Sequence, residues 1–229
     1  MKIAATSDMH GIFPEIPKAD VLCIAGDICP THDHSFSYQR KWVLTEFCTW
    51  CQGLVRDGIV KNVVFIAGNH DWVFEDLMEK NEEAWFRSSL PEDVFYLRDS
   101  EVIIDGIRFW GTPHTPPFCD WAFNVREEGL NEIFSKIPEG IDVLISHGPP
   151  YEYWDSVDWT VRQTDPLGSK ALIQHVKRAH PRYTFSGHIH TGNHVPQKVI
   201  HENKNINVVN VSLINEQYEK TYPVFECEI

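Results

Sequence analysis

Residues 62–71 read NVVFIAGNHD, and this stretch carries the pattern that decides the fold. Its first part, NVVFIA, is apolar and rich in β-branched and aromatic side chains, which is typical of a short buried strand. Gly68 follows, and a glycine there fits a tight turn in which the backbone comes close to other groups. Because Asn69, His70 and Asp71 come next, the pattern predicts a buried strand with metal-type ligands at its carboxyl end.

The same design recurs at four other places, where an apolar run ends and polar side chains of metal-binding type follow at once. These places are Ser7-Asp8-Met9-His10, Gly26-Asp27, Ser146-His147-Gly148 and Gly187-His188-Ile189-His190. Functional side chains of open α/β folds gather at the carboxyl ends of the strands, so we expect these groups to crowd one edge. Imidazole and carboxylate groups bind first-row divalent ions, and a carboxylate can bridge two of them. The recurrence therefore predicts a metal centre.

Each block taken alone also has a purely structural interpretation. Asp27 could cap a turn, Asn69 could supply a left-handed residue, and Asp71 could be the N-cap of a following helix. The histidines of the later blocks could be ordinary residues at strand ends. These interpretations would have to hold independently in all five blocks and always at the end of a strand, so we favour the metal centre.

The rest of the chain alternates apolar runs with segments of helical periodicity. The apolar runs are 2–7, 21–25, 62–67, 142–146 and 183–186, and the helix-like segments are 36–56, 75–87 and 170–179. Ser169 fits the N-cap of the last helix. Alternating strands without helices lie around Asp105-Gly106 and in 195–200, 205–211 and 222–227. They predict a second, largely antiparallel sheet. We find no internal repeat and expect residues 1–229 to form a single α/β domain.

The composition describes a globular protein with a strongly negative charge. The 229 residues are 42% hydrophobic and 23% charged, which excludes an intrinsically disordered chain. The formal net charge of −13 opposes binding to long nucleic acids and to anionic membranes. An anionic substrate must therefore be met by a local positive centre.

Two features bear on the cellular compartment. Strand-like sequence begins at Lys2 without a leader segment before it, and no apolar run approaches about 18 residues. The six cysteines are scattered, several of them inside apolar runs, which is typical of free thiols in a reducing compartment. Cys48 and Cys51 have the spacing of a zinc or redox pair, but they lie within a helical pattern and have no second pair, so we favour core packing. These features predict a soluble, cytoplasmic protein.

Three loops that contain proline and glycine follow predicted strands, at 29–38, 111–120 and 148–168. We expect them at the carboxyl edge of the sheet, where they would form the rim of the site. His32-Asp33-His34 and His114 belong to these loops and could touch a substrate, although exposed loop residues are the simpler interpretation. Trp121, Phe123 and Asn124 could stack on and hydrogen-bond a base, or pack inside the protein.

With its five blocks in order, the sequence resembles the calcineurin-like metallophosphoesterase superfamily. The signature of that family is Asp-x-His, Gly-Asp, Gly-Asn-His-Asp/Glu, His and Gly-His-x-His, and the resemblance covers residues 3–212. Trp121-Ala122-Phe123-Asn124, His147-Gly148-Pro149-Pro150 and Leu167-Gly168-Ser169 look like the small metallophosphoesterase domain-containing phosphodiesterases. The resemblance implies a four-layer α/β/β/α sandwich, in which two central mixed sheets are flanked by helices.

The resemblance also implies a role for each matching residue. Asp8, His10 and His190 would hold one metal ion, Asn69, His147 and His188 would hold a second, and Asp27 would bridge the two. His70 would assist the leaving group, and Asn69, His70 and Asn124 would bind the substrate. Two divalent ions about 3.5–4 Å apart would activate a hydroxide for in-line attack on phosphorus. Because the ligands include no thiolate, Mn²⁺ is favoured, while Fe, Zn²⁺, Co²⁺ and Ni²⁺ also suit the site.

One departure from the family pattern is informative. Protein phosphatases of this superfamily follow Gly-Asp with an Asp-Arg pair, in which the Asp orients the catalytic histidine and the Arg grips phosphate. Here residues 26–31 read GDICPT. The missing pair counts against a Ser/Thr protein phosphatase and leaves the group that orients His70 unidentified. His188 is absent from some members that bind metal poorly; it is present here, so we expect a complete binuclear centre.

Together these features predict metal-dependent hydrolysis of a small phosphoester. The resemblance favours a phosphodiester substrate, such as a small diester or a cyclic nucleotide. A phosphomonoesterase with the same centre is the first alternative, and a binding module without catalysis is the second. Such modules tend to lose metal ligands or the histidine at position 70, and this chain keeps them all. The sequence makes no prediction of the oligomeric state.

Overall fold

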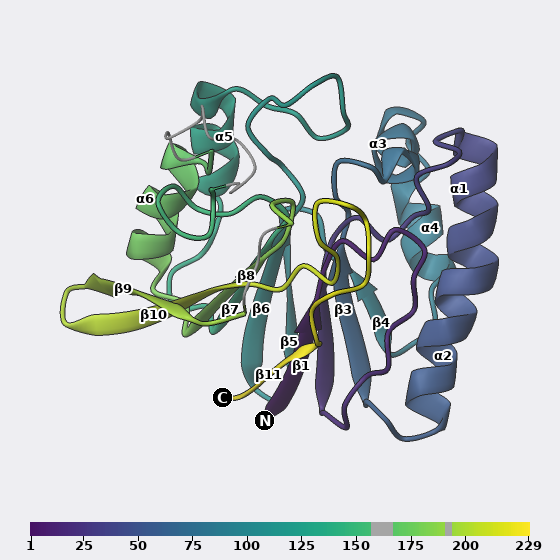
Figure 1. Cartoon of the computed structure of the whole chain (residues 1–229), viewed down its shortest axis with the longest axis horizontal. Helices are drawn as coiled ribbons and strands as arrows, with labels where there is room; N and C mark the ends of the chain where they lie inside the picture. The colour runs from purple at the N-terminus through teal and green to yellow at the C-terminus, as the bar shows by residue number, and fades with distance from the viewer. Residues whose placement is uncertain (157–166, 191–193) are drawn as a thin grey trace.

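The computed structural model describes residues 1–156, 167–190 and 194–229. Two β-sheets lie face to face and helices cover the outer side of each, which confirms the predicted α/β/β/α order of layers (Figure 1). The strands are β1 (Lys2–Thr6), β2 (Val21–Ala25), β3 (Asn62–Ile66), β4 (Val94–Tyr96), β5 (Ser100–Ile104), β6 (Ile107–Thr112), β7 (Val143–Ser146), β8 (Tyr183–Ser186), β9 (Gln197–His201), β10 (Lys204–Asn210) and β11 (Phe225–Glu228). The helices are α1 (Phe36–Trp42), the π-helical turn η1 (Val43–Phe47), α2 (Cys48–Arg56), α3 (Trp72–Glu79), α4 (Glu83–Ser89), α5 (Glu127–Phe134) and α6 (Lys170–Ala179).

The first sheet has the strand order β11-β1-β2-β3-β4. β1, β2, β3 and β4 run parallel, while β11 joins the edge antiparallel to β1. Helices connect β2 to β3 and β3 to β4, and such crossovers return the chain to the end from which a parallel strand must start. The carboxyl ends of β1, β2 and β3 therefore share one edge of the sheet.

The second sheet has the strand order β5-β6-β7-β8-β10-β9. β6, β7, β8 and β10 run parallel, and only the edge strands β5 and β9 are antiparallel to their neighbours. The prediction of a largely antiparallel second sheet is therefore wrong, because β7 and β8 follow the helices α5 and α6 and join as parallel crossover strands. The predicted strand at 222–227 is β11, which belongs to the first sheet.

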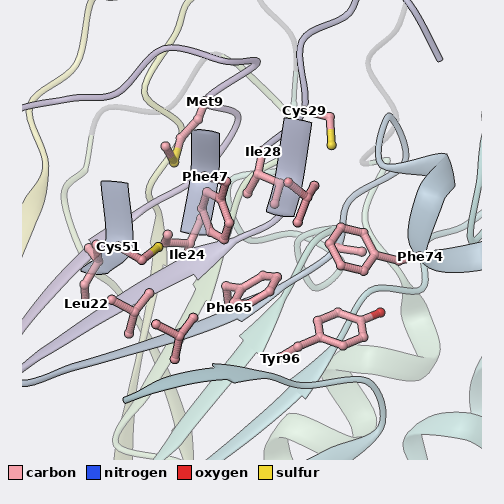
Figure 2. Packing of buried hydrophobic residues seen from close by; sticks show 14 of the residues in the cluster. Met9, Leu22, Ile24, Ile28, Cys29, Phe47, Cys51, Phe65, Phe74 and Tyr96 are labelled. Carbon is pink, nitrogen blue, oxygen red and sulfur yellow. The ribbon is translucent and has the colours of Figure 1, made fainter. Parts of the chain in front are cut away.

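Alternation along the strands divides the apolar side chains among separate clusters. In β2, Leu22 and Ile24 face the helices, whereas Val21 and Cys23 face the second sheet. Figure 2 shows the cluster on the helix side, where aromatic rings surround Phe65 of β3. Full burial of one large apolar side chain contributes about 1.5–3 kcal/mol. The sheet is thus packed on both faces, and the ends of its strands are held in fixed positions.

The helices differ from the sequence patterns at two places, since α5 has no predicted counterpart and one predicted helix is interrupted. The segment 75–87 forms two helices, α3 and α4, because Asn81 between them adopts a left-handed backbone with φ of 57°. The segment 36–56 is helical throughout, with the π turn in its middle. Ser169 caps α6 as predicted, since its Oγ accepts a hydrogen bond of 3.1 Å from the Leu172 N–H.

The remaining fold-level expectations concern cysteines, loops and membranes. All six cysteines are free thiols, and Cys48 and Cys51 are buried on the helix side of the first sheet, which confirms core packing. The loops that follow β2, β6 and β7 leave the carboxyl ends of their strands, although part of the third, 157–166, lies outside the described residues. Within the described parts of the chain, no helix is long and apolar enough to cross a membrane.

Candidate metal centre

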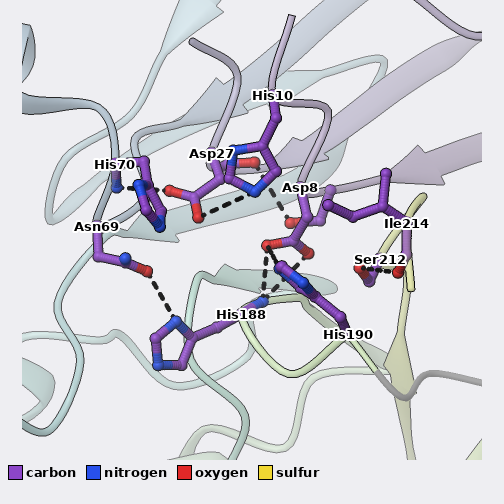
Figure 3. A network of polar contacts seen from close by, with 12 residues as sticks. Asp8, His10, Asp27, Asn69, His70, His188, His190, Ser212 and Ile214 are labelled. Atoms are coloured by element: carbon purple, nitrogen blue, oxygen red, sulfur yellow. Dashed lines mark hydrogen bonds and ion pairs between the residues drawn. The ribbon is translucent and has the colours of Figure 1, made fainter. Parts of the chain in front are cut away.

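The five polar blocks of the sequence come together where strands of both sheets end. The first sheet contributes Asp8 and His10 after β1, Asp27 after β2, and Asn69 and His70 after β3; the second contributes His147 after β7, and His188 and His190 after β8. Figure 3 shows most of these side chains turned toward one another near the ends of the strands. The site is therefore assembled from both sheets, and neither sheet contains it alone.

Four of these residues have a backbone that L-amino acids rarely adopt. Asp8, His10, Asp27 and His188 have φ values of 52°, 44°, 52° and 65°. Each such residue costs about 1–3 kcal/mol unless the surrounding structure imposes it. Backbone hydrogen bonds between the first two loops impose it here: Asp8 N–H donates to Gly26 O at 3.0 Å, and His10 N–H donates to Asp27 O at 2.9 Å. Strain at clustered polar residues is typical of a functional site.

A first group of possible metal ligands consists of Asp8, His10 and His190, whose ligand atoms all lie within 4.8 Å of one another. His190 Nε2 lies 3.5 Å from Asp8 Oδ1. Both ring nitrogens of His10 are buried and have no hydrogen-bond partner among the described residues. A buried polar atom without a partner is costly, and a metal ion at this position would supply the missing partner. The residues present therefore fit a divalent ion.

A second group consists of Asp8, Asp27 and His147, again with ligand atoms within 4.8 Å of one another. Asp27 lies between the two groups, since its Oδ2 is 3.7 Å from His10 Nε2 and 3.5 Å from His147 Nε2. Asn69 reaches the second group through its side-chain oxygen, which lies 2.8 Å from His147 Nε2 and 2.7 Å from His188 Nδ1. The position of Asp27 between imidazoles of the two groups suits a bridging carboxylate.

Burial and charge set the protonation of these groups. Burial would raise the pKa of Asp8, but His190 beside it outweighs burial and lowers this pKa to about 2. Burial lowers the pKa of His10 to about 4 and that of His188 to about 3. The pKa of His147 rises to about 9, because the nearby Asp27 carboxylate outweighs the opposing effect of burial. The site thus offers ionised carboxylates together with imidazoles, which is a donor set for first-row divalent ions.

His70 lies beside these ligands and contacts them through its backbone. Its N–H donates to Asp27 Oδ1 at 2.8 Å, while its ring packs at 4.2 Å from the ring of Trp121, measured between centroids. The ring Nδ1 lies 3.3 Å from Nε2 of His34. His34 is thus within hydrogen-bond distance of the His70 ring, a partner that the sequence did not identify. The histidines of the loop 29–38 were the available signal, because the sequence placed them on the rim.

Asp71 occupies the N-cap position of α3, but its side chain makes no capping hydrogen bond to that helix. Its carboxylate instead accepts hydrogen bonds from the backbone N–H groups of Ile28 and Cys29, at 3.1 and 2.8 Å, and from that of Gly68 at 2.8 Å. Burial raises the pKa of this carboxyl group to about 6, and the charge of Asp27 adds to the effect. Asp71 therefore ties the loop after β2 to the loop after β3.

In the loop after β6, some side chains stabilise the loop itself and one contacts His70 beside the candidate metal ligands. The side-chain amide of Asn124 donates to the backbone oxygens of Phe118 and Cys119, at 3.1 and 3.2 Å, and so holds its own loop together. A substrate contact by Asn124 stays a prediction. Phe123 is buried, and the His114 ring donates to Asp99 at 2.9 Å, so these two side chains stabilise the loop. Trp121 is the member of this loop that reaches His70.

Tyr218, which the sequence did not single out, also lies next to the candidate metal ligands. The ring of Tyr218 lies 5.0 Å from that of His10 and 5.3 Å from that of His190, between centroids, and the residue is 46% exposed. Phe118, which is 59% exposed, lies next to His188, with 6.1 Å between the centroids of the two rings. No motif marks Tyr218, since it comes from a loop before β11 that only the folded chain brings to the centre.

Two mixed sheets flanked by helices, with carboxylate and imidazole groups clustered at the strand ends, define the architecture of a metallophosphoesterase. The chain belongs to the calcineurin-like phosphoesterase family, whose sequence model matches residues 1–192. Membership of this family supports metal-dependent phosphoester hydrolysis at a binuclear divalent centre, and the candidate ligand groups fit such a centre.

Individual relatives agree with this assignment. Human metallophosphoesterase domain-containing protein 1 is 33% identical over 213 residues, which cover 83% of this chain and 61% of the human protein. UPF0046 protein T07D4.2 of Caenorhabditis elegans is 29% identical over 207 residues, which cover 78% of this chain and 48% of that protein. The chain thus spans about half to three-fifths of the length of these relatives. The crystal structure of TT1561 from Thermus thermophilus has a TM-score of 0.54 at 14% identity and covers 90% of this chain and 88% of that one, so it shows the shared fold.

Proposed function

We propose that this protein hydrolyses small phosphodiesters, including cyclic nucleotides, at a binuclear metal centre. The observation that carries the proposal is the place of Asp27, whose Oδ2 lies 3.7 Å from His10 Nε2 and 3.5 Å from His147 Nε2. Asp8, His10 and His190 would hold one ion, Asn69, His147 and His188 the other, and Asp27 would bridge them. Two divalent ions supply Lewis acidity toward the phosphoryl oxygens and lower the pKa of water, and Mn²⁺ is the favoured ion.

His70 is the proposed catalytic residue for the leaving group. Its backbone N–H is fixed on Asp27, so the ring lies beside the metal ligands. We place a proton on His70 Nδ1 in a hydrogen bond to His34 Nε2, so that the protonated His70 ring can give its Nε2 proton to the departing oxygen and become neutral. His34 would thereby do the orienting that an aspartate does in the protein phosphatases. Trp121 restricts the ring from one side.

The rim of the site supports a diester that carries a planar group. Phe118 and Tyr218 are 59% and 46% exposed and lie next to His188 and to His10, respectively. Exposed rings beside a catalytic centre can stack on a nucleobase or an aryl group. The arginine that grips the dianion of a phosphomonoester in the protein phosphatases has no counterpart in residues 26–31. The proposed substrate is therefore small, singly charged at phosphorus and aromatic.

The test is a substrate panel on protein of known metal content. Elemental analysis comes first, followed by assays with bis(p-nitrophenyl) phosphate, p-nitrophenyl phosphate, cyclic nucleotides and duplex DNA, each with Mn²⁺, Fe, Zn²⁺, Co²⁺ or Ni²⁺ added. We expect kcat/KM to be higher for the diester than for the monoester, and no useful cleavage of DNA. A higher value for the monoester would favour the phosphomonoesterase. Bound metal without turnover of any substrate would favour the binding module.

A further inference from the structure

A second cluster of metal-type side chains lies at the opposite edge of the second sheet from the candidate metal centre. His180 follows the last turn of α6, just before β8, and has a left-handed backbone with φ of 54°. His201 ends β9, and Glu202 opens the tight turn into β10. Because His180 precedes β8 whereas His188 and His190 follow it, the two clusters lie at opposite ends of that strand.

The three side chains converge on one point. Their ligand atoms all lie within 4.8 Å of one another. His180 Nε2 lies 3.8 Å from Glu202 Oε2, and His201 Nε2 lies 4.0 Å from Glu202 Oε1, so each imidazole faces one oxygen of the same carboxylate. The two rings stack with centroids 5.2 Å apart and planes 24° apart. This arrangement brings two nitrogen donors and a carboxylate to one small region.

Packing within the protein does not account for this arrangement. His180 Nε2 is closed off from solvent, yet it has no hydrogen-bond partner in the parts of the chain that the structure describes. The distance of 3.8 Å between His180 Nε2 and Glu202 Oε2 is too long for a hydrogen bond. Buried polar atoms almost always have a partner, so an atom without one calls for a ligand or a bound ion. An ion between the three side chains would satisfy His180 Nε2 and the carboxylate together.

We propose that His180, His201 and Glu202 form a second, separate binding site for a first-row divalent ion, with Zn²⁺ the best match. Two imidazoles and a carboxylate are a ligand set that Zn²⁺ commonly uses, with water in the fourth position. Ligand atoms must lie about 2.0–2.2 Å from the ion, so the group has to close slightly. His201 and Glu202 have side chains 39% and 70% exposed and can move to do so.

The electrostatics of the neighbourhood set the expected affinity. The carbonyl end of α6 favours a cation. The positive charges of Lys177 and Arg178 in the last turn of α6 disfavour a cation. Arg178, however, donates a hydrogen bond of 2.6 Å to the backbone oxygen of Ile137 and lies 4.0 Å from the Glu139 carboxylate. We therefore expect these charges to permit the binding of a cation. The bound ion would fasten the β9–β10 hairpin to the end of α6.

The test counts ions on the protein with its first centre loaded. Equilibrium dialysis against Zn²⁺, with metal analysis of the protein, should give one more ion per chain for wild type than for His201→Ala or Glu202→Gln. The matched control is His32→Ala, which removes a histidine elsewhere on the surface and should bind as wild type does. Phosphoesterase activity should change less than about twofold in His201→Ala, because that residue lies far from the first centre.

The difference of one ion can be read whatever the first centre binds, so the two proposals stand or fall separately. We expect His201→Ala and Glu202→Gln to weaken binding of that ion at least tenfold while the far-ultraviolet circular dichroism stays unchanged. Equal stoichiometry and affinity in wild type and in both folded variants would overturn the proposed second site. Loss of the extra ion in His32→Ala as well would also overturn it, since binding would then be a general property of surface histidines.

Discussion

Asp27 and His188 differ in how many ions each is proposed to hold, and this difference can be measured. Asp27→Ala should lose activity and most of both ions, because its carboxylate lies between imidazoles of the two groups. His188→Ala should keep one ion and a small residual rate. Metal analysis and kcat on the purified variants check this, with the exposed Asp57→Ala as a control. Two tightly bound ions per chain in Asp27→Ala would contradict the bridging role.

A proton donor matters most when the leaving oxygen is strongly basic, which provides a test of His70. General-acid assistance commonly contributes about 10²–10⁴-fold. His70→Ala should therefore keep its ions. Its rate on a nucleotide, whose leaving oxygen is an alkoxide, should fall by a factor of that order, and its rate on p-nitrophenyl esters should fall distinctly less. A series of esters with increasing leaving-group pKa, measured on wild type and variant, shows this as a steeper dependence. Equal losses along the series, or missing metal, would remove the acid role.

His34 should act through His70 rather than on the substrate. The two ring nitrogens are 3.3 Å apart, so His34→Ala should reproduce the steeper leaving-group dependence of His70→Ala in weaker form, with unchanged metal content. His34→Gln keeps a hydrogen-bond acceptor, its side-chain oxygen, and should recover part of the loss. His32→Ala, which changes a neighbouring histidine, should behave as wild type does. A rate loss in His34→Ala that is the same for every leaving group would contradict the positioning role.

The candidate ligands could be predicted from the sequence because each lies directly after a strand. A strand end is visible in the sequence, and parallel strands bring such ends together. His34 and Tyr218 could not be predicted in the same way, because their contacts depend on the paths of loops. The contacts of Asn124 could not be predicted either: its side-chain amide donates to backbone oxygens of its own loop, and its contact with a substrate stays a prediction.

At the scale of the element, the turn after β3 leaves no space for a side chain at Gly68. A Cβ atom there would overlap the Asp27 carboxylate and backbone nitrogen and the ring of His147. Gly68→Ala should therefore displace two proposed ligands, lower the ion content and abolish activity. Gly53→Ala is the matched control, because a Cβ in α2 meets nothing closer than Arg56 at 3.8 Å; it should stabilise the protein by roughly 0.5–1 kcal/mol.

Metal analysis and thermal unfolding of both glycine variants check this prediction. A fully loaded and active Gly68→Ala would show that the turn can move without cost to the ligands. The elements themselves were predicted unevenly. Helix 36–56 and the central strands followed from periodicity, whereas the direction of the strands in the second sheet did not, because pairing depends on which helices cross over between strands.

At the scale of the whole molecule, removing the ions should loosen the contact between the sheets. The proposed ligands come from both sheets, and four of them have a strained backbone that bound ions would help to hold. An ion present at 100 times its dissociation constant stabilises by about 2.7 kcal/mol, which corresponds to roughly 5–10 °C in Tm for a chain of this size. Calorimetry of chelated and reloaded protein checks the shift. An unchanged Tm would contradict a link between the sheets.

Asp8 and His190 lie 3.5 Å apart in space but 182 positions apart in the chain (190 − 8). A ribosome that adds about 5–20 residues per second needs roughly 10–40 s to pass from one to the other. Until His190 is made, the emerging chain carries the carboxylates of the first sheet without the full set of histidines of the second, so a captured ion would have only part of its ligand shell. Selection among metals therefore falls after His190 has been made, and the ion acquired should reflect the free metals that surround the chain from that stage on.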